Sequence, residues 1–387
     1  MDKKTYKLKD FAEPIAVAVT DPQKSCHNIF VGLEHYDSGE PVISRFSDTS
    51  LLNSSCKEFQ KNDILIARRN VYLRRAGIAP FDGLTSGDSI VLRLFEDCEE
   101  RTGISYDIAI KIIPFVLNSN SFWLYANRHA DGMNSKRISK EKVLDYEFDL
   151  PSLSEQKVLA EKLWAAYEVK QSYLRMIEAI EEMVKSQFIE MFGDPMVNDK
   201  QWSEYSCISE ITQIVLGSTP NSKEPSYWDG DIRWITPAEM TDQSYYIFDT
   251  VRQITDKGRK AANLTVLPEG TVLFSTRAPI GKVAIVGKEM CCNQGFKNFI
   301  CSEKLNNVFL YYTLKLKKDY LCSLGTGTTF KELSKRTVES LKIAVPPIEL
   351  QNQFETIYNQ ADKSGIELRK SIDAIDKVIK SLINENL

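Results

Sequence analysis

Two long segments of the chain carry the same heptad pattern of apolar residues. The pattern alternates steps of four and three from Leu159 to Met191, and again from Phe354 to Leu382. Such a stripe lies on one face of an α-helix and is typical of two helices packed along their length. We therefore predict a long helix pair whose seam contains Leu163, Tyr173, Ile177, Ile180 and Val184 from one helix and Tyr358, Leu368, Ile372, Ile375 and Ile379 from the other.

Local signals agree with these helices. Ser152 follows a proline and precedes Glu155 by three residues, which is the pattern of a capping box. Gly193 and Pro195 supply a stop for the first helix. Three positions depart from the apolar pattern of the seam, namely Lys170, Gln187 and Gly365. The polar faces carry mixed charge, which argues against basic, nucleic-acid-binding helices.

The two helical segments belong to an internal repeat. Residues 132–192 align without a gap with residues 327–387, and 14 of these 61 pairs are identical. Ordinary residue usage would give about four identical pairs by chance, at roughly 6%. The identical pairs include Pro151 with Pro346, Gln156 with Gln351 and Ile177 with Ile372. The chain is therefore an internal duplication with an offset of 195 residues.

Each helix follows a module rich in predicted strands. In the first module, short apolar runs alternate with turn-rich stretches, at Ile15–Val19, Ile29–Leu33, Ile64–Ala67, Ser89–Leu94 and Ala109–Val116. One or two helices are expected there, one of them near Phe115–Ala126. In the second, strands are expected at Ile211–Leu216, Ile232–Ile235, Thr271–Ser275, Val283–Val286 and Asn298–Ile300, with a helix at Asn307–Leu316. The modules also align at Asp63–Arg69 and Thr271–Arg277, where the offset is 208 because the first module carries a 13-residue insertion.

These patterns predict an α+β protein in four parts. Residues 1–149 form the first β-rich module, 150–195 the first long helix, 196–344 the second module and 345–387 the second long helix. Two similar modules on two helices that share a seam should be related by a pseudo-twofold, with the helices antiparallel. The N-terminus would then lie near the C-terminal end of the second helix.

Composition narrows the class of protein. The chain has 387 residues, is 43% hydrophobic and 26% charged, and carries a net charge of −4, as expected of a soluble globular protein. We find no membrane-length apolar run and no signal-peptide pattern, so we expect a cytoplasmic protein. None of the eight cysteines has metal-ligand spacing, and with only three histidines we expect no metal site.

Catalytic motifs are not apparent. The stretch Gly281–Lys288 is one residue too long for a P-loop, and Glu289 stands where Ser or Thr is required. The sequence contains no GxGxxG after a strand, no GxSxG elbow, no HExxH and no amino-methyltransferase tetrapeptide. We therefore expect no catalytic residues and no cofactor bound by this chain.

Basic and polar residues gather instead at a few places that suit DNA. The first is a strand end and loop, from which we select Arg68, Arg69, Asn70, Tyr72, Arg74 and Arg75. Arginine bonds guanine edges and phosphates with two parallel hydrogen bonds, and asparagine pairs with adenine. A loop held by salt bridges is the alternative for these residues. In the second module the corresponding candidates are Ser218, Thr219, Asn221, Arg277, Lys282, Asn293, Gln294 and Lys297.

A glycine-rich loop with lysine precedes each long helix. These loops span residues 131–137 and 325–331, and their candidates are Lys136, Arg137, Thr328, Thr329 and Lys331. Backbone amides, hydroxyls and lysine suit phosphate contacts that set register on DNA. A plain tight turn explains the glycines equally well. Trp228 and Trp234 are left out because tryptophan is more often a core residue than a base contact.

Several of these stretches resemble the specificity subunits of type I restriction-modification systems. Gly325–Lys331, Leu333-Ser334, Val345–Ile348 and Gln351 resemble the end of a target-recognition domain of that family. Leu216–Pro220, Tyr227-Trp228, Leu273–Arg277 and Asn293–Gly295 are similar to earlier parts of such a domain, and Phe188–Pro195 to the end of the central spacer helix. The first module departs most, because Ala67-Arg68-Arg69 replaces the usual stretch and no Gly-Ser-Thr-Pro segment occurs near Thr20.

The resemblance implies a non-catalytic subunit that selects a DNA sequence. Two target-recognition domains would each read half of a split double-stranded target, with the paired helices as spacer. Modification subunits with S-adenosylmethionine, and restriction subunits that use ATP and Mg²⁺, would dock on it. Three alternatives stay open: a modification-only complex, an enzyme with an unrecognised site, and a scaffold that binds proteins.

Overall fold

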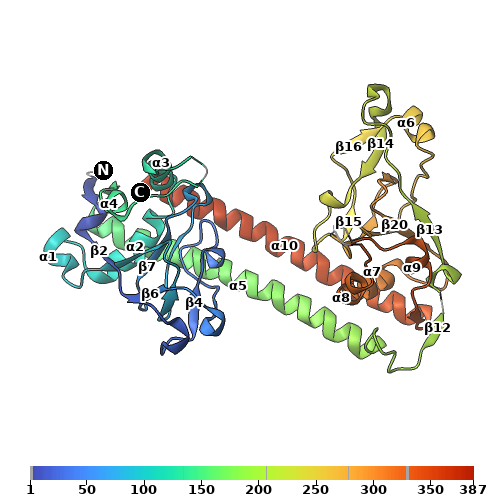
Figure 1. The fold of residues 1–387 in the computed structure, drawn as a ribbon, viewed down its shortest axis with the longest axis horizontal. Helices are drawn as coiled ribbons and strands as arrows, with labels where there is room; N and C mark the ends of the chain where they lie inside the picture. Colours follow the sequence, from blue (N-terminus) through green and yellow to red (C-terminus); the bar gives the residue numbers. More distant parts are fainter. Residues whose placement is uncertain (1–2, 134, 206, 278, 328–330) are drawn as a thin grey trace. The chain divides into compact units, whose positions relative to one another are not determined.

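The computed structural model describes residues 3–133, 135–205, 207–277, 279–327 and 331–387. The chain divides into two compact units, of which unit 1 comprises Met1–Arg175 with Leu368–Leu387 and unit 2 comprises Met176–Glu367. Each long helix, α5 (Leu153–Phe192) and α10 (Ile348–Asn386), therefore contributes one end to each unit. Figure 1 shows the red end of α10 beside the blue and cyan strands of unit 1.

Unit 1 is built from two antiparallel-rich sheets with short helices. Its strands are β1 (Lys4–Lys7), β2 (Ala12–Ile15), β3 (Ala18–Val19), β4 (Ile29–Val31), β5 (Ser47–Asp48), β6 (Cys56–Phe59), β7 (Ile64–Ala67), β8 (Ala76–Ile78), β9 (Gly83–Thr85), β10 (Ser89–Leu94) and β11 (Glu147–Leu150). Its short helices are α1 (Cys98–Thr102), α2 (Tyr106–Val116), α3 (Asn120–His129) and α4 (Lys140–Leu144). The sheet orders are β2-β10-β7-β8 and β3-β6-β9-β4-β5, and β1 pairs with β11.

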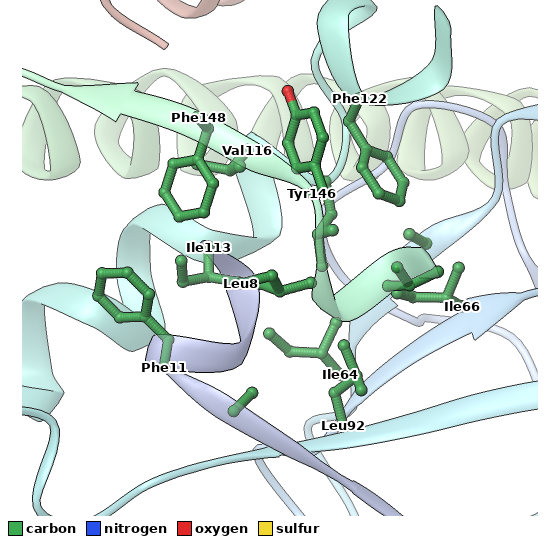
Figure 2. Packing of buried hydrophobic residues seen from close by; sticks show 14 of the residues in the cluster. Leu8, Phe11, Ile64, Ile66, Leu92, Ile113, Val116, Phe122, Tyr146 and Phe148 are labelled. Atoms are coloured by element: carbon green, nitrogen blue, oxygen red, sulfur yellow. The ribbon is translucent and has the colours of Figure 1, made fainter. Parts of the chain in front are cut away.

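Apolar strands of unit 1 bury their side chains against its helices. Ile64 and Ile66 of β7 and Leu92 of β10 are buried in one cluster with Ile113 of α2 and Phe122 of α3. Figure 2 shows these side chains packed with Leu8, Phe11, Tyr146 and Phe148. This core fixes the ends of β7 and β10, where the candidate arginines of the first module begin.

Unit 2 has the same kinds of element. Its strands are β12 (Ser203–Tyr205), β13 (Thr212–Leu216), β14 (Trp228–Ile235), β15 (Tyr246–Ile247), β16 (Arg252–Ile254), β17 (Val272–Phe274), β18 (Val283–Val286), β19 (Cys291–Cys292), β20 (Lys297–Cys301) and β21 (Ile343–Val345). Its short helices are α6 (Asp256–Ala261), α7 (Asn307–Leu316), α8 (Lys318–Ser323) and α9 (Lys335–Glu339). The sheet orders are β13-β20-β17-β18-β15 and β16-β14-β19, and β12 pairs with β21.

The seam of the two long helices follows the predicted positions. Every seam residue named above is buried or half-buried, including Lys170, Gln187 and Gly365. In unit 1, Leu159 and Leu163 of α5 pack with Ile383 near the end of α10. In unit 2, Phe188 near the end of α5 packs with Phe354 near the start of α10. Further along α5, Lys170 pairs with Asp376, which precedes Ile383 in α10, so the two helices run antiparallel within unit 1.

The helix ends also follow the sequence signals. The Glu155 carboxylate accepts the Ser152 N–H at 3.0 Å, and Gly193 follows α5 with a φ of +78°. Lys3 Nζ donates to the Glu385 carbonyl at 3.3 Å, so the N-terminal residues lie beside the end of α10, as predicted.

Two sequence predictions for the first module were wrong. The run Ala109–Val116 is not a strand but lies in α2, and the helix expected at Phe115–Ala126 is two helices, α2 and α3. A short run that is apolar on all sides cannot be assigned to strand or buried helix by periodicity alone. The break falls before Asn120 because the Ser119 hydroxyl caps α3 by accepting the Phe122 N–H. The run Ile15–Val19 is likewise divided between β2 and β3.

Neither long helix is apolar enough to span a bilayer, and the same holds for every other helix in the described residues.

Candidate nucleic-acid interface

In unit 1 the structure brings together two segments that the sequence predicted separately. Arg69 and Arg137 form an isolated antiparallel bridge, which joins the end of β7 to the loop before α4. The Ile138 N–H donates to the Arg68 carbonyl at 3.0 Å, and the Asn70 N–H donates to the Lys136 carbonyl at 2.8 Å. The candidate residues 68–70 and 136–137 therefore form one surface.

Three arginines of this surface share one carboxylate. Arg137 Nη2 lies 3.3 Å from Asp88 Oδ2, while Arg68 Nε and Arg69 Nη1 lie 3.9 Å from oxygens of the same side chain. The arginine side chains are 36–47% exposed. Arg69 Nε also donates to Ser135 Oγ at 2.8 Å. Because one carboxylate faces three guanidinium groups, the surface keeps a positive excess that suits phosphate oxygens.

The loop after Arg69 is strained in a way that presents Tyr72. Asn70 and Arg74 have φ values of +54° and +52°, in the left-handed region that non-glycine residues seldom adopt. Tyr72 lies between them and is 61% exposed. Arg74 is exposed, and its Nη1 donates to Asn120 Oδ1 at 2.9 Å. The strain favours a functional loop over a plain connection.

Arg75 has a different environment from its neighbours. Its guanidinium donates to the Leu33 carbonyl at 2.7 Å and to the Arg69 carbonyl at 3.0 Å. Burial lowers the pKa of Arg75. These hydrogen bonds hold the loop together. A DNA contact by Arg75 stays a prediction, because the guanidinium would have to break these bonds to reach DNA. Lys136, by contrast, is exposed.

Unit 2 repeats this backbone arrangement with other side chains. Arg277 and Glu332 form the bridge in place of Arg69 and Arg137. The Thr276 N–H donates to the Gly295 carbonyl at 2.8 Å, as the Arg68 N–H donates to the Asp88 carbonyl at 3.0 Å. The scaffold is thus common to both units, whereas its charges are not.

Glu332 pairs with two of the candidate cations of unit 2. Its carboxylate lies 3.0 Å from Arg277 Nε and 3.2 Å from Lys297 Nζ. The Lys297 side chain is 7% exposed and also donates to Thr276 Oγ1 at 3.0 Å. Lys282 Nζ donates to the carbonyls of Pro237 and Met240. Of the three predicted cations, Arg277 is therefore the best placed to reach DNA, and contacts by the two lysines stay predictions.

The predicted loop at residues 217–221 lies against the loop at 293–294. A side chain at Gly217 would place its Cβ 1.9 Å from the Asn293 carbonyl oxygen, so this close approach requires glycine. The Thr219 hydroxyl donates to the Gln294 side-chain oxygen. Asn293 is half-buried, and its Oδ1 accepts the Gly295 N–H at 2.8 Å. Thr219, Asn221 and Gln294 are exposed, which leaves them accessible to a ligand.

Two tryptophans that the sequence reasoning set aside hold this loop. Trp234 Nε1 donates to the Ser218 carbonyl at 3.0 Å, and Trp228 Nε1 donates to the Asn221 carbonyl at 3.1 Å. They are core residues, as expected, but they also position candidate residues. Nothing in the sequence marked this role, because it depends on where two indole N–H groups point.

The last candidates lie at the loop before α9. Lys331 is exposed next to Glu332, whereas Thr328 and Thr329 lie outside the described residues. Sequence reasoning also missed Asp88 and Glu332, the carboxylates that organise the arginines of each unit. Glu332 could have been found through the repeat, because it aligns with Arg137 at the offset of 195.

Comparison with known proteins gives the surface its context. Residues 200–375 match the family described as Type I restriction modification DNA specificity domain. A specificity subunit of the type I restriction enzyme MjaIX from Methanocaldococcus jannaschii is 36% identical over 186 residues. Part of the chain is therefore similar to the specificity subunits of type I restriction-modification systems.

The matches to individual relatives are partial in length. The MjaIX match covers 47% of this chain and 43% of that subunit. The putative MjaX specificity subunit of the same organism is 25% identical over 297 residues, covering 71% of this chain and 67% of the relative. The HindI specificity subunit of Haemophilus influenzae is 24% identical over 188 residues, which are 47% of this chain and 41% of the relative.

Solved structures share the fold along the whole chain. The specificity subunit from M. genitalium gives a TM-score of 0.58 at 12% identity, covering 99% of this chain and 95% of that one. A chain from a structure of the assembly and conformational transition of the type I R-M system gives a TM-score of 0.56 at 17% identity, with 99% and 97% covered. At these identities the similarity is one of fold alone.

Proposed function

We propose that the chain selects the DNA target of a type I restriction-modification complex, with one half of a split target read by each unit. In this proposal the chain carries two target-recognition domains on an antiparallel helix pair, with an internal pseudo-twofold repeat. The chain itself performs no chemistry. The proposal rests on the similarity of residues 200–375 to the DNA specificity domain, together with the surfaces built around Arg69 in unit 1 and Arg277 in unit 2.

One observation supports the proposal that each unit recognises a different half of the target. The same backbone bridge presents Arg69 with Arg137 in unit 1 and Arg277 with Glu332 in unit 2. Base edges in the major groove are told apart by the donors and acceptors that face them. Two surfaces with a shared backbone and different side chains therefore suit two short half-sites of different sequence.

The outward side of the first long helix supports the docking of partner subunits. Within unit 1, Val158 and Val169 are 48% and 44% exposed, and within unit 2, Met176 and Met183 are each 50% exposed. Exposed apolar residues that recur along one helix mark an interaction surface. We assign it to modification subunits, which would bring S-adenosylmethionine, and to restriction subunits, which would bring ATP and Mg²⁺.

The half-sites should be separated by unspecified bases. Two modules that enter the major groove from one side of B-DNA fit sites about one turn apart, 34–36 Å or 10 base pairs from centre to centre. Helices of 40 and 39 residues join the two modules, so their length sets this gap in our proposal.

Methylation mapping tests the function directly. Genomic DNA is sequenced for methylated bases from cells with the gene intact and from cells with it deleted. We expect a two-part motif with an unspecified gap that disappears on deletion. An unchanged methylation map, together with no binding of the purified chain to duplex DNA at low salt, would refute the proposal and favour a protein-binding scaffold.

A further inference from the structure

A small arm of unit 2 has its own apolar core. It consists of β14, β16 and α6, which lie together at one end of unit 2 in Figure 1, away from α7 and α8. Trp228, Trp234, Ile254, Leu264 and Cys291 form the buried cluster of the arm. The rings of the two tryptophans meet edge to face at 5.2 Å. The arm is therefore a rigid element built around an indole pair.

Arg252 lies on this indole pair. Its guanidinium carbon is 3.6 Å from the centre of the Trp228 ring and 5.6 Å from the centre of the Trp234 ring. A guanidinium over an indole face is attracted by the ring quadrupole and is held flat. The side chain is exposed, so it sits on a fixed platform at the surface of the arm.

The charge of Arg252 is left without an acidic partner in the described part of unit 2. Three other cations of the arm differ in this respect, because Arg233 lies 3.4 Å from Asp249, and Arg259 and Lys260 lie within 2.8 Å of Asp256. The N–H groups at the edge of the stacked guanidinium are thus available to a ligand outside the arm. An anionic or hydrogen-bond-accepting partner is the chemistry that they fit.

The same two indoles join Arg252 to the candidate loop. The face of Trp228 carries Arg252, while its N–H donates to the Asn221 carbonyl, and the Trp234 N–H donates to the Ser218 carbonyl. We propose that Arg252 is a further DNA-contacting residue of unit 2, which reads the same half-site as the loop at residues 218–221. The inference rests on the proposed function and adds a residue to it.

The stacked geometry explains why arginine suits this position. A planar guanidinium presents two parallel N–H groups to a phosphate or to the O6 and N7 atoms of guanine, and lysine cannot do so. Because the indole holds the group in place before binding, less conformational entropy is lost when DNA binds.

The test uses the full chain and a library of random duplexes, from which bound molecules are sequenced. Wild type is compared with Arg252→Gln, Arg252→Lys and the control Lys260→Gln, which removes a charge from the same arm. A base contact predicts that Arg252→Gln relaxes one position of one half-site and weakens binding about 5- to 150-fold, without rescue by lysine. A phosphate contact predicts weaker binding to all sequences. The slope of the logarithm of the binding constant against the logarithm of the salt concentration should fall in magnitude by about 0.9, and Arg252→Lys should restore binding.

The results distinguish a failure of the role of Arg252 from a failure of the proposed function. If wild type enriches a two-part motif and Arg252→Gln matches Lys260→Gln in motif, affinity and salt slope, the role of Arg252 is refuted while the proposed function stands. If wild type enriches no sequence, the proposed function fails and the inference fails with it. Equal melting temperatures of the variants show that a loss of binding does not reflect unfolding.

Discussion

The two candidate surfaces share one backbone arrangement and differ in whether their positive charges are paired with carboxylates. In unit 1, Arg68, Arg69 and Arg137 gather around Asp88, and the positive charge exceeds the negative. In unit 2, Glu332 occupies the place of Arg137 and pairs with Arg277 and Lys297. Arg252, which has no acidic partner in the described residues of unit 2, lies on the arm rather than at the bridge.

This difference shows which part of a duplicated protein is free to change. The bridge depends on backbone hydrogen bonds, which many side chains permit, so the scaffold is kept while its side chains diverge. Two copies of one scaffold can then read two sequences. If so, the two units should be equivalent in structure and different in recognition.

The largest effect is expected from changing helix length. Deleting residues 174–180 from α5 alone shifts one end of α5 by a heptad against α10, so the packing of unit 1 or of unit 2 is lost. The aromatic contacts of Phe188 with Phe354 and Phe309 are among those at risk, and each lost aromatic side chain costs about 3–5 kcal/mol. We expect this variant to lose cooperative thermal unfolding.

The compensated deletion is the matched control. Deleting residues 369–375 as well restores the heptad match, so the protein should fold. The unspecified gap of the methylated motif should then shorten while both half-sites persist. An unchanged gap would refute the role of the helices as a ruler.

Neutralising the arginines should affect the two units unequally. Arg69→Gln with Arg137→Gln removes two exposed cations and should cost roughly 1–3 kcal/mol of binding for each base-reading arginine. Arg277→Gln should cost less, because Glu332 already pairs with Arg277.

Conversely, Glu332→Gln should strengthen binding by freeing Arg277. Titrations of duplex DNA at several salt concentrations measure these effects, and equal losses in both units would contradict the comparison.

The two repeated glutamines offer a comparison inside the scaffold. Gln351 Nε2 donates to the Pro346 and Lys304 carbonyls, and its Oε1 accepts the Asn306 N–H. Gln156 donates to the Pro151 carbonyl, and its Oε1 is buried with no partner among the residues that the structure describes. At about 1 kcal/mol for each bond, Gln351→Met should cost about 3 kcal/mol and Gln156→Met about 1 kcal/mol or less. Denaturant unfolding distinguishes this order from equal costs.

An effect of modest size is expected at the seam position Lys170. In unit 1 its ammonium pairs with Asp376 at 2.7 Å and with Glu40, whereas the repeat places Gly365 at the corresponding position. Lys170→Met should cost about 1–2 kcal/mol, because two half-exposed carboxylates lose a partner. The exposed Lys162→Met on the same helix is the control and should be neutral.

The contribution of Lys170 should depend on pH at the alkaline end. Burial acts to lower the pKa of Lys170, but its hydrogen bonds to Asp376 and Glu40 outweigh this and raise the pKa above 10.5. A raised lysine pKa stabilises the fold fully below 10.5, and this stability is lost as pH rises through the folded pKa. The difference in unfolding free energy between wild type and Lys170→Met should therefore shrink above about pH 10.5 and stay constant near neutrality.

The helices and several strands were predictable because local patterns determine them. The start of α7 at Asn307 follows from the Asn306 cap, and β18 from four consecutive apolar residues, Val283–Val286. The predicted seam position is buried even at Lys170, because a position in a heptad pattern predicts burial independently of the side chain that occupies it. By contrast, residue type could not distinguish the exposed Arg69 from the half-buried Arg75.

The missed parts of the candidate site depend on contacts between distant segments. Asp88 meets Arg137 across 49 residues, and Trp234 meets Ser218 across 16 residues. Such pairs arise from strand order and loop conformation, which the local pattern around each residue does not contain. The tryptophans were set aside on their usual preference for the core, which was right but incomplete.

Methylation sequencing of two complementary variants tests most directly whether each unit reads its own half of the target. One culture carries Arg69→Gln with Arg137→Gln, and the other carries Arg277→Gln with Arg252→Gln, each in place of the wild-type chain. Our account predicts that the first variant relaxes one half of the methylated motif, that the second relaxes the other half, and that the gap stays the same. If both halves change together in either variant, or if neither half changes in both, the assignment of one half-site to each unit is wrong.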